Sequence, residues 1–565
     1  MRDIRRSLAT AMTGGLLLVP LVGTASLGAS PVPSGPATAE LGNPAFPDSP
    51  AIFAPTRPPI DLTVTLDPGA AVSAVIPVDG GDIEATGADG TVYHLSIPDD
   101  ALVEETEIQM TPVASLDGLP TGGTVSYAVQ LAPDGLQLFD FATLTITPSA
   151  ELPIEEQLPF GYDGDGKGLF IATPVVDEPA IQLLIQHFSG YGVSKGLLAD
   201  IEPERERLGG SEERRLQSQV AEALGRERQR QLLGGEEDLD IAELFGSAFA
   251  EYERTVVEPR VRAAGESCAK GRLALETVLG LERQKQLIGM SDGSGFPTDL
   301  MSTVARVCVQ EEYELCRDDH IVHRMIPVTL GFERQRQLLG IEDPAAKAFE
   351  EDLAVRCLTF ELVLESEAEL KEQGFRATSN MESRTTLRYE PAELAIRGSS
   401  ALTNTDFVVK VPKCGATPHP SDSTVDVMSL TWVTAPRGAG DQLGAITDYT
   451  LTWLPNPTAE SATIACPLMK KFELTLGLWS LLFPILHQDE FQAAAAAPRA
   501  FAFLQGGAGP FQLPDLQPIE NPGPFRTTGW TVAEDELLAE KEWSKSGRGG
   551  KISEEGSFEL HHTPE

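Results

Sequence analysis

The sequence lacks the short motifs that accompany several common kinds of catalysis. Its 565 residues contain no Gly-rich phosphate loop, no Gly-x-Ser-x-Gly elbow, no His-Glu-x-x-His and no Cys-x-x-Cys. Aromatic residues make up only 6%, without a stripe that would indicate a carbohydrate platform, and the eight histidines are scattered. We therefore expect no cofactor and favour a non-enzymatic binding or structural protein. A secreted hydrolase with an unrecognised site stays an alternative.

Basic residues are scarce, above all near the amino terminus. The net charge is −41, and residues 58–194 hold 21 acidic residues against one basic residue, Lys167. Such a surface repels phosphate groups, so the charge excludes nucleic acid and disfavours anionic membrane surfaces. The expected partner is an unidentified protein or surface.

Long apolar runs are also few. A basic start, Arg2 to Arg6, precedes an apolar stretch and small residues, which is typical of a bacterial secretory signal peptide at 1–29. The alternative is an uncleaved anchor formed by the uncharged stretch from Leu8 to Ser30. A Pro-rich linker at 30–59 follows. No later segment has the length and apolarity of a transmembrane helix. We expect a protein that is secreted, periplasmic or on the cell surface.

Residues 60–196 read as short alternating strands between Gly, Asp and Pro, which predicts a β-sandwich. Three segments, Gly80–Ile83, Ile97–Leu102 and Thr106–Thr111, resemble the Gly-Gly turn, the Ile-Pro-x-x-Ala-Leu corner and the following strand of ZU5-type β-domains. The resemblance covers about a quarter of the chain. It implies a ZU5-like β-sandwich at 60–196.

Some ZU5 relatives cut themselves within a His-Phe-Ser tripeptide, and this chain has His187, Phe188 and Ser189 in that order. By this resemblance the Ser189 hydroxyl would attack the Phe188 carbonyl while His187 accepts the proton. An autoproteolytic module cleaving Phe188–Ser189 is thus the second functional hypothesis. The alternative is that Phe188 is a core residue with ordinary polar neighbours.

The phrase Leu-Gly-x-Glu-Arg-Gln-x-Gln-Leu-x-Gly occurs three times, at 224–234, 279–289 and 330–340. Its residues favour helix, and the closing Gly suits a left-handed cap. We predict a helical repeat region at 200–356, with Glu–Arg or Glu–Lys pairs on the solvent side. The polar face is either solvated, bonded to a neighbouring copy, or a repeated ligand or partner surface.

Six cysteines in an exported chain predict disulfides. Cys308 and Cys316 lie eight residues apart on one expected helix, so their Cα atoms are about 12 Å apart and cannot be bridged. Each must pair with Cys268 or Cys357, and the spacing does not say which. We expect Cys414 and Cys466 to be paired. No two cysteines have zinc-ligand spacing.

The remaining residues, 357–565, alternate as strands, which predicts a C-terminal antiparallel β-domain. We expect no metal site, because three weak candidates have simpler explanations. His320 and His323 suit a solvated helix end, residues 162–168 suit a hairpin turn, and His561 and His562 suit a terminal strand. The fold class is multidomain α+β: an N-terminal β-sandwich, a central disulfide-stapled α-helical repeat region and the C-terminal β-domain.

Overall fold

The structure is a computed structural model that describes residues 49–121, 125–235, 239–291, 296–372, 374–435, 445–456, 460–467, 471–476, 486, 491–493, 524–533, 536–547 and 549–565. These residues contain antiparallel strands, helices and three disulfides, so the expected mixture of α and β structure is present. The predicted signal peptide and residues 30–48 of the predicted linker lie outside the described residues.

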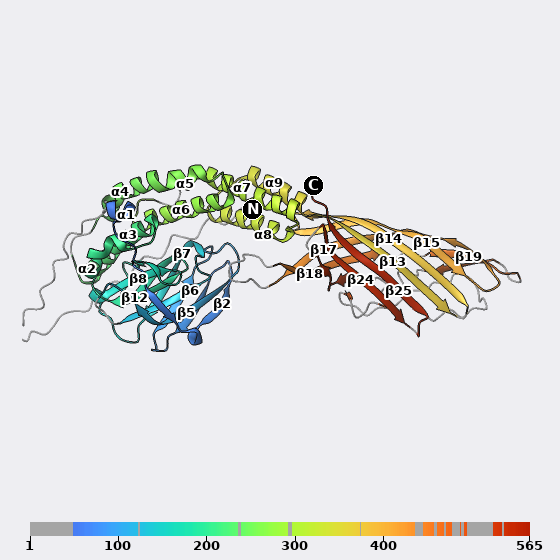
Figure 1. Ribbon diagram of the computed structural model, residues 1–565, viewed down its shortest axis with the longest axis horizontal. Helices are drawn as coiled ribbons and strands as arrows, with labels where there is room; N and C mark the ends of the chain where they lie inside the picture. Colours follow the sequence, from blue (N-terminus) through green and yellow to red (C-terminus); the bar gives the residue numbers. More distant parts are fainter. Residues whose placement is uncertain are drawn as a thin grey trace, which may run out of the picture. The chain divides into compact units, whose positions relative to one another are not determined.

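The first strands form two antiparallel sheets (Figure 1). One has the order β1-β5-β6-β12-β8-β9, with β2 also paired to β5, and the other has the order β10-β11-β7-β4-β3. The strands are β1 (Thr63–Leu66), β2 (Val72–Ile76), β3 (Gly81–Thr86), β4 (Val92–Ile97), β5 (Thr106–Asp117), β6 (Ser126–Ala132), β7 (Gln137–Thr147), β8 (Gln157–Asp163), β9 (Lys167–Phe170), β10 (Thr173–Pro174), β11 (Ile181–His187) and β12 (Gly190–Lys195).

Alternation of apolar residues explains why these sheets pack. Leu95 on β4, Leu144 on β7 and Val129 on β6 are fully buried in one core cluster shared by both sheets. A second cluster covers the other face of the first sheet, where Phe160 on β8 packs with Leu198 and Ala221 from the helical region. The first sheet is therefore buried on both faces at β8 and β12, whereas β1 and β2 are largely exposed.

The middle of the chain is helical, as its composition predicts. The α-helices are α1 (Ser49–Phe53), α2 (Leu198–Ile201), α3 (Glu212–Leu232), α4 (Ile241–Tyr252), α5 (Glu258–Ala263), α6 (Cys268–Leu287), α7 (Thr298–Asp319), α8 (Met325–Leu338) and α9 (Pro344–Cys357). Short 3-10 turns span Pro68–Ala70, Ile154–Glu156, Glu202–Arg207 and Val322–Arg324, and a π-turn spans Glu253–Val257. The side chains of Ser211, Asp240, Ser267 and Asp343 cap helix amino termini.

Each copy of the repeated phrase ends a helix, namely α3, α6 or α8. The closing residues Gly234, Gly289 and Gly340 have φ values of 83°, 74° and 66°. In all three copies the N–H that follows this glycine bonds back to the carbonyl five residues earlier, at 2.8 Å. The predicted left-handed glycine cap is confirmed, because only this conformation closes the last turn in that way.

The six cysteines form three disulfides. Cys268 at the start of α6 bonds to Cys308 in the middle of α7, and Cys316 near the end of α7 bonds to Cys357 at the end of α9. This pairing is one of the two that helical spacing left open. Cys414 bonds to Cys466 beside the paired strands β16 and β19.

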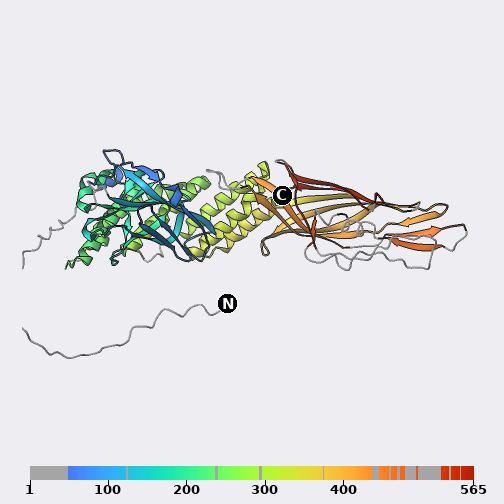
Figure 2. The same ribbon diagram turned by 90° about the horizontal axis from the view of Figure 1, so that it is seen from below.

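The last strands form a long antiparallel sheet of order β21-β22-β18-β17-β15-β14-β13-β25-β24-β23, and a smaller sheet of order β16-β19-β20. The long central strands of the larger sheet lie side by side in both views (Figure 1, Figure 2). The strands are β13 (Thr359–Glu372), β14 (Phe375–Glu390), β15 (Ala395–Lys410), β16 (Gly415–His419), β17 (Ser423–Thr434), β18 (Ile446–Asn456), β19 (Glu460–Ala465), β20 (Phe472–Leu476), β21 (Phe491–Ala493), β22 (Phe525–Thr527), β23 (Thr531–Val532), β24 (Leu537–Gly547) and β25 (Ile552–His562).

The long sheet and the helices share one core. Trp453 and Phe558 are buried in the sheet with ring centroids 5.4 Å apart. The same cluster of buried residues continues through Phe360 and Leu358 into α7 and α9. A single residue, Leu358, separates α9 from β13, so the helical and sheet segments are joined by packing as well as by the chain.

Candidate functional site

The predicted cleavage tripeptide lies between two strands of different sheets. Strand β11 ends at His187 and β12 begins at Gly190, so Phe188 and Ser189 form the connection. Both residues are buried, with 0% and 1% of their surface exposed. The Phe188 carbonyl oxygen accepts a hydrogen bond from the Gly135 N–H at 2.9 Å. One backbone donor therefore polarises the carbonyl that the resemblance identifies as the electrophile.

His187 is held as a neutral imidazole. Its Nδ1 lies 3.0 Å from the Tyr191 hydroxyl, whose own proton goes to the His187 carbonyl oxygen at 2.8 Å. Because that proton is used, Nδ1 carries the ring proton and Nε2 keeps a lone pair. Nε2 is buried and makes no hydrogen bond, and the Asp163 carboxylate lies 3.8 Å from it. Burial, with the charge of Arg214 as a smaller cause, holds the pKa of His187 well below its usual value.

Ser189 is not aligned with this base. Its hydroxyl donates to the Tyr162 carbonyl oxygen on the neighbouring strand β8. Before the Ser189 hydroxyl could attack the Phe188 carbonyl carbon, its hydrogen bond to the Tyr162 carbonyl oxygen would have to break. The site thus has a polarised carbonyl and a neutral base, while the nucleophile is bonded elsewhere in this resting arrangement.

Close packing requires glycine directly after the tripeptide. A Cβ atom on Gly190 would lie 1.9 Å from the Tyr162 ring, so no other residue fits there without a shift. Arg214, from α3, packs 4.8 Å over the Phe170 ring and donates to the Asp163 carboxylate at 3.1 Å. These contacts place a cation beside His187, which explains the smaller of the two causes of its lowered pKa.

The repeated phrases present one equivalent arginine to the N-terminal strands. Arg228 donates to the carbonyl oxygens of residues 178, 179 and 180 at 3.0 to 3.2 Å and to Gln157 at 3.0 Å. Arg283 lies 4.0 Å from Asp140 on β7. Arg334 donates to Asp100, just after β4, at 2.6 Å. All three arginines are the fifth residue of their copy, so in every copy the side chain of the fifth residue contacts the sandwich.

The seventh position of the phrase bonds within the helical region instead. Arg230 pairs with Glu227 on its own helix, and Lys285 pairs with Glu253 and Glu282. The expectation that the phrase's ion pairs face solvent is wrong for the first two copies. The side chains of Glu227 and Arg230 are only 9% and 16% exposed, and the loop after α3 bonds to both of them. The side chains of Glu282 and Lys285 are only 13% and 18% exposed.

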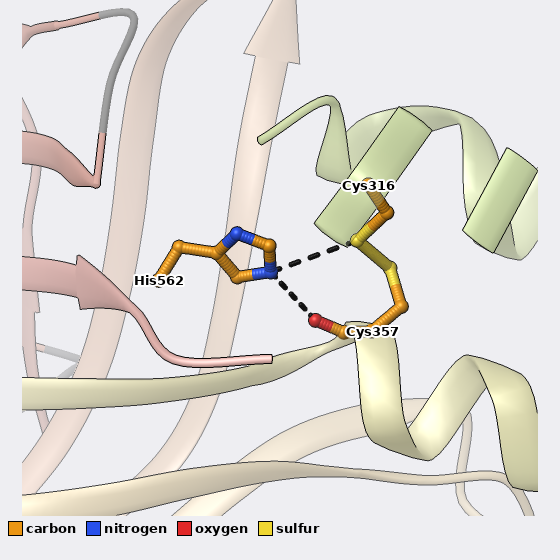
Figure 3. Close-up of side chains that lie close together, drawn as sticks. All are labelled: Cys316, Cys357 and His562. Atoms are coloured by element: carbon orange, nitrogen blue, oxygen red, sulfur yellow. Dashed lines mark hydrogen bonds between the residues drawn. A yellow bond between two sulfur atoms is a disulfide. The ribbon is translucent and has the colours of Figure 1, made fainter. Parts of the chain in front are cut away.

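Two histidines that lie far apart in the sequence meet where the helices join the long sheet. His320 ends α7 with a left-handed φ of 56°, and its Nδ1 lies 2.9 Å from Nδ1 of His562 at the end of β25. The Nε2 of His562 lies 2.7 Å from the Cys357 carbonyl oxygen and 3.6 Å from Cys316 Sγ (Figure 3). The sequence explained His320 and His323 as a solvated helix end, whereas in the structure His320 contacts His562 and His323 lies in the following 3-10 turn.

The protonation of this histidine pair follows from its partners. A carbonyl oxygen can only accept, so His562 carries its proton on Nε2 and accepts at Nδ1 from His320. Burial is the main reason that the pKa of His562 falls to about 4, and His320 lowers it further. Spacing along the chain gave no signal for this arrangement, because Cys316 lies 41 residues from Cys357 and 246 residues from His562.

Other predicted features are local structure. Residues 162–168 form the hairpin turn between β8 and β9, as expected. An open cavity of about 460 Å³ is lined by Asp61, Glu204 and Arg207 among others. These charges are already paired, Asp61 with Lys167 and Glu204 with Arg207. The cavity therefore offers no free charged group from these three residues.

Comparison with known proteins assigns the chain to no family. No protein-family model matches the sequence, and no curated protein matches it significantly. Within the described residues, no helix combines the length and apolarity that crossing a membrane requires.

Proposed function

We propose that this is a secreted or cell-envelope bacterial protein with a non-enzymatic binding or structural role. Its residues 60–196 would be a ZU5-like β-sandwich that the helical repeats hold, and its partner would be a protein or surface outside the cytoplasm. The observation that carries the proposal is the set of equivalent arginines, Arg228, Arg283 and Arg334, that reach the sandwich from three copies of one phrase.

The chemistry of these contacts supports a holding role. Burial lowers the pKa of both Arg228 and Arg283, so their hydrogen bonds and the Asp140 carboxylate offset only part of the cost of desolvating them. A repeat that only continued a solvated helix would have no reason to keep arginine at this position. Three buried or half-buried disulfides add support, because such bonds persist in oxidising compartments.

Hydrogen exchange tests the holding role. In a variant with Arg228, Arg283 and Arg334 changed to Ala, we expect faster amide exchange in the sandwich segments around residues 100, 140 and 178–180. The matched control removes three cations of the same region that are exposed and pair only within their own helix or its entry: Arg254, Arg262 and Lys270. Equal exchange in the two variants would contradict the role assigned to the arginines.

Cell fractionation tests the compartment. In the producing bacterium we expect the chain outside the cytoplasm, with all six cysteines protected from alkylation until a reductant is added. Recovery of the chain in the cytoplasm with free thiols would overturn the proposal, whatever the exchange experiment shows.

Self-cleavage at Phe188–Ser189 is the second candidate, favoured by the Nε2 of buried His187, which makes no hydrogen bond, and by the Gly135 N–H on the Phe188 carbonyl. The Ser189 oxygen would attack that carbonyl carbon, the Ser189 nitrogen would leave with a proton, and water would cleave the resulting ester. A denaturing gel of purified protein tests it. Two fragments that disappear in Ser189→Ala support cleavage, and a single full-length band excludes it.

A further inference from the structure

Three potential metal ligands converge where the helices meet the long sheet. Cys316 comes from α7, Cys357 from the end of α9 and His562 from the end of β25. Their side chains are 0%, 0% and 1% exposed, and their ligand atoms lie within 4.8 Å of one another. At present the two sulfur atoms are bonded to each other, and His562 Nε2 faces them (Figure 3).

We propose that reduction of the Cys316–Cys357 disulfide turns this junction into a zinc site with Cys316 Sγ, Cys357 Sγ and His562 Nε2 as ligands. The fourth position of the tetrahedron would be taken by water, as in zinc sites with three protein ligands. The site is masked as long as the disulfide is intact. The inference is independent of the binding or structural role proposed above.

The distances suit zinc. Bonds of about 2.3 Å to sulfur and about 2.0 Å to nitrogen place the two atoms of a tetrahedral site roughly 3.6 Å apart. The observed separation of His562 Nε2 and Cys316 Sγ is 3.6 Å. After reduction the two sulfurs need only move to about 3.8 Å from each other to complete the same tetrahedron. The histidine is thus already at ligand distance from one sulfur.

The far side of the ring suits a ligand as well. An imidazole that binds a metal through one nitrogen usually donates the other N–H to a fixed acceptor. His320 Nδ1 lies 2.9 Å from His562 Nδ1 and could accept that proton after both rings change tautomer. Because His320 ends α7 in a left-handed conformation, the chain itself directs its ring to this position.

The chemical step balances with a dithiol as the reductant. One thiolate of the dithiol attacks the disulfide, the second completes the exchange, and the dithiol becomes a cyclic disulfide while Cys316 and Cys357 become thiols. Zinc then binds two thiolates and releases two protons. His562 binds as a neutral ring, so it adds no further proton to the count.

The other two disulfides provide internal controls. Cys268 donates its backbone N–H to Glu311, and Cys414 lies beside the β16–β19 pair. Among the residues that the structure describes, the group of Cys316, Cys357 and His562 is the one in which three such ligand atoms come together. Zinc should therefore distinguish one cysteine pair from the others in the same molecule.

The test uses the full chain, refolded from denaturant with a dithiol and with or without zinc chloride. Alkylation of the refolded protein, followed by mass spectrometry, reads each cysteine separately. We expect zinc to protect Cys316 and Cys357 from alkylation and to leave Cys268 and Cys414 unprotected. Equal alkylation of all cysteines with and without zinc would overturn the proposal without any variant.

Substitution of neighbouring histidines adds a matched comparison. We expect one zinc per reduced wild-type chain by competition with a chromogenic chelator, unchanged binding in His561→Gln, and loss of that zinc in His562→Gln. His561 adjoins His562 on β25 but pairs with Glu559. Cobalt should show a thiolate charge-transfer band in the wild type and a weakened one in His562→Gln. Retention of full zinc and of the same band by His562→Gln would rule out His562 as a ligand.

Discussion

His562 should make the junction between the helices and the long sheet sensitive to acid. Its folded pKa is about 4, whereas the usual value is 6.5. Above pH 6.5 the ring is neutral in both folded and unfolded chains, so it adds no pH dependence. As the pH falls from 6.5 to 4 the unfolded chain binds a proton that the folded chain does not, and stability is lost. Below about 4 both states are charged and the loss levels off.

The size of the loss follows from the shift in pKa. A difference of about 2.5 units corresponds to roughly 3 kcal/mol in full, of which about 2.5 kcal/mol is reached by pH 4.5. Little discount for solvent applies, since His562 is 1% exposed. Its charged form would meet His320, the backbone oxygen of Cys357 and the disulfide sulfurs, none of which is an anion. Of this set, the Cys357 backbone oxygen favours the charged ring, but its effect is smaller than that of burial.

Comparison with a variant isolates this residue from other titrating groups. Denaturant unfolding of the oxidised protein at pH 7 and pH 4.5 gives the loss for the wild type and for His562→Gln. We expect the wild type to lose about 2.5 kcal/mol more than the variant. A ring titration by NMR should place the His562 pKa near 4. An NMR value of 6 or above, or equal losses in the two proteins, would refute this reasoning.

Two further predictions concern packing and charge. Arg336 and Glu350 form a two-fold hydrogen-bonded ion pair whose side chains are 5% and 2% exposed, so Arg336→Leu should cost about 3–5 kcal/mol in denaturant unfolding. The double variant Arg336→Leu/Glu350→Leu should cost less than that single change, and a strictly additive result would contradict the account. Gly190→Ala should cost about 3 kcal/mol or more because of the Tyr162 ring, whereas Gly246→Ala in α4 has open space and should stabilise by roughly 0.5–1 kcal/mol. Similar melting temperatures for the two alanine variants would count against the clash.

Local chemistry made several features predictable from sequence. The glycine after each repeated phrase adopts the left-handed conformation because no residue but glycine does so at little cost, and this depends on neighbours alone. The rise of a helix excluded a bridge between Cys308 and Cys316, whatever the tertiary structure. Alternating strands before and after the helices are equally a local pattern.

Contacts between distant segments were not predictable. The three carbonyl oxygens that receive Arg228 carry no sequence signature, since any residue supplies a carbonyl. His562 meets His320 across 242 residues, and motif spacing detects only ligands that are close in the chain. No two cysteines are two to four residues apart in the sequence, as expected. That spacing says nothing about side chains that the fold brings together, such as Cys316, Cys357 and His562.

The repeated phrase combines a local sequence pattern with contacts between distant segments. Its fifth and seventh residues differ by two positions, which is about 200° around a helix, so their side chains leave on opposite sides. In the third copy the fifth residue, Arg334, donates a hydrogen bond to Asp100 of the sandwich. The seventh residue, Arg336, donates to Glu350 on α9. In the second and third copies, therefore, one cation faces the sandwich and another pairs with a different helical element, whereas in the first copy Arg230 pairs with Glu227 on its own helix. These contacts explain why Arg-Gln-Arg or Arg-Gln-Lys recurs more strictly than a solvated face needs.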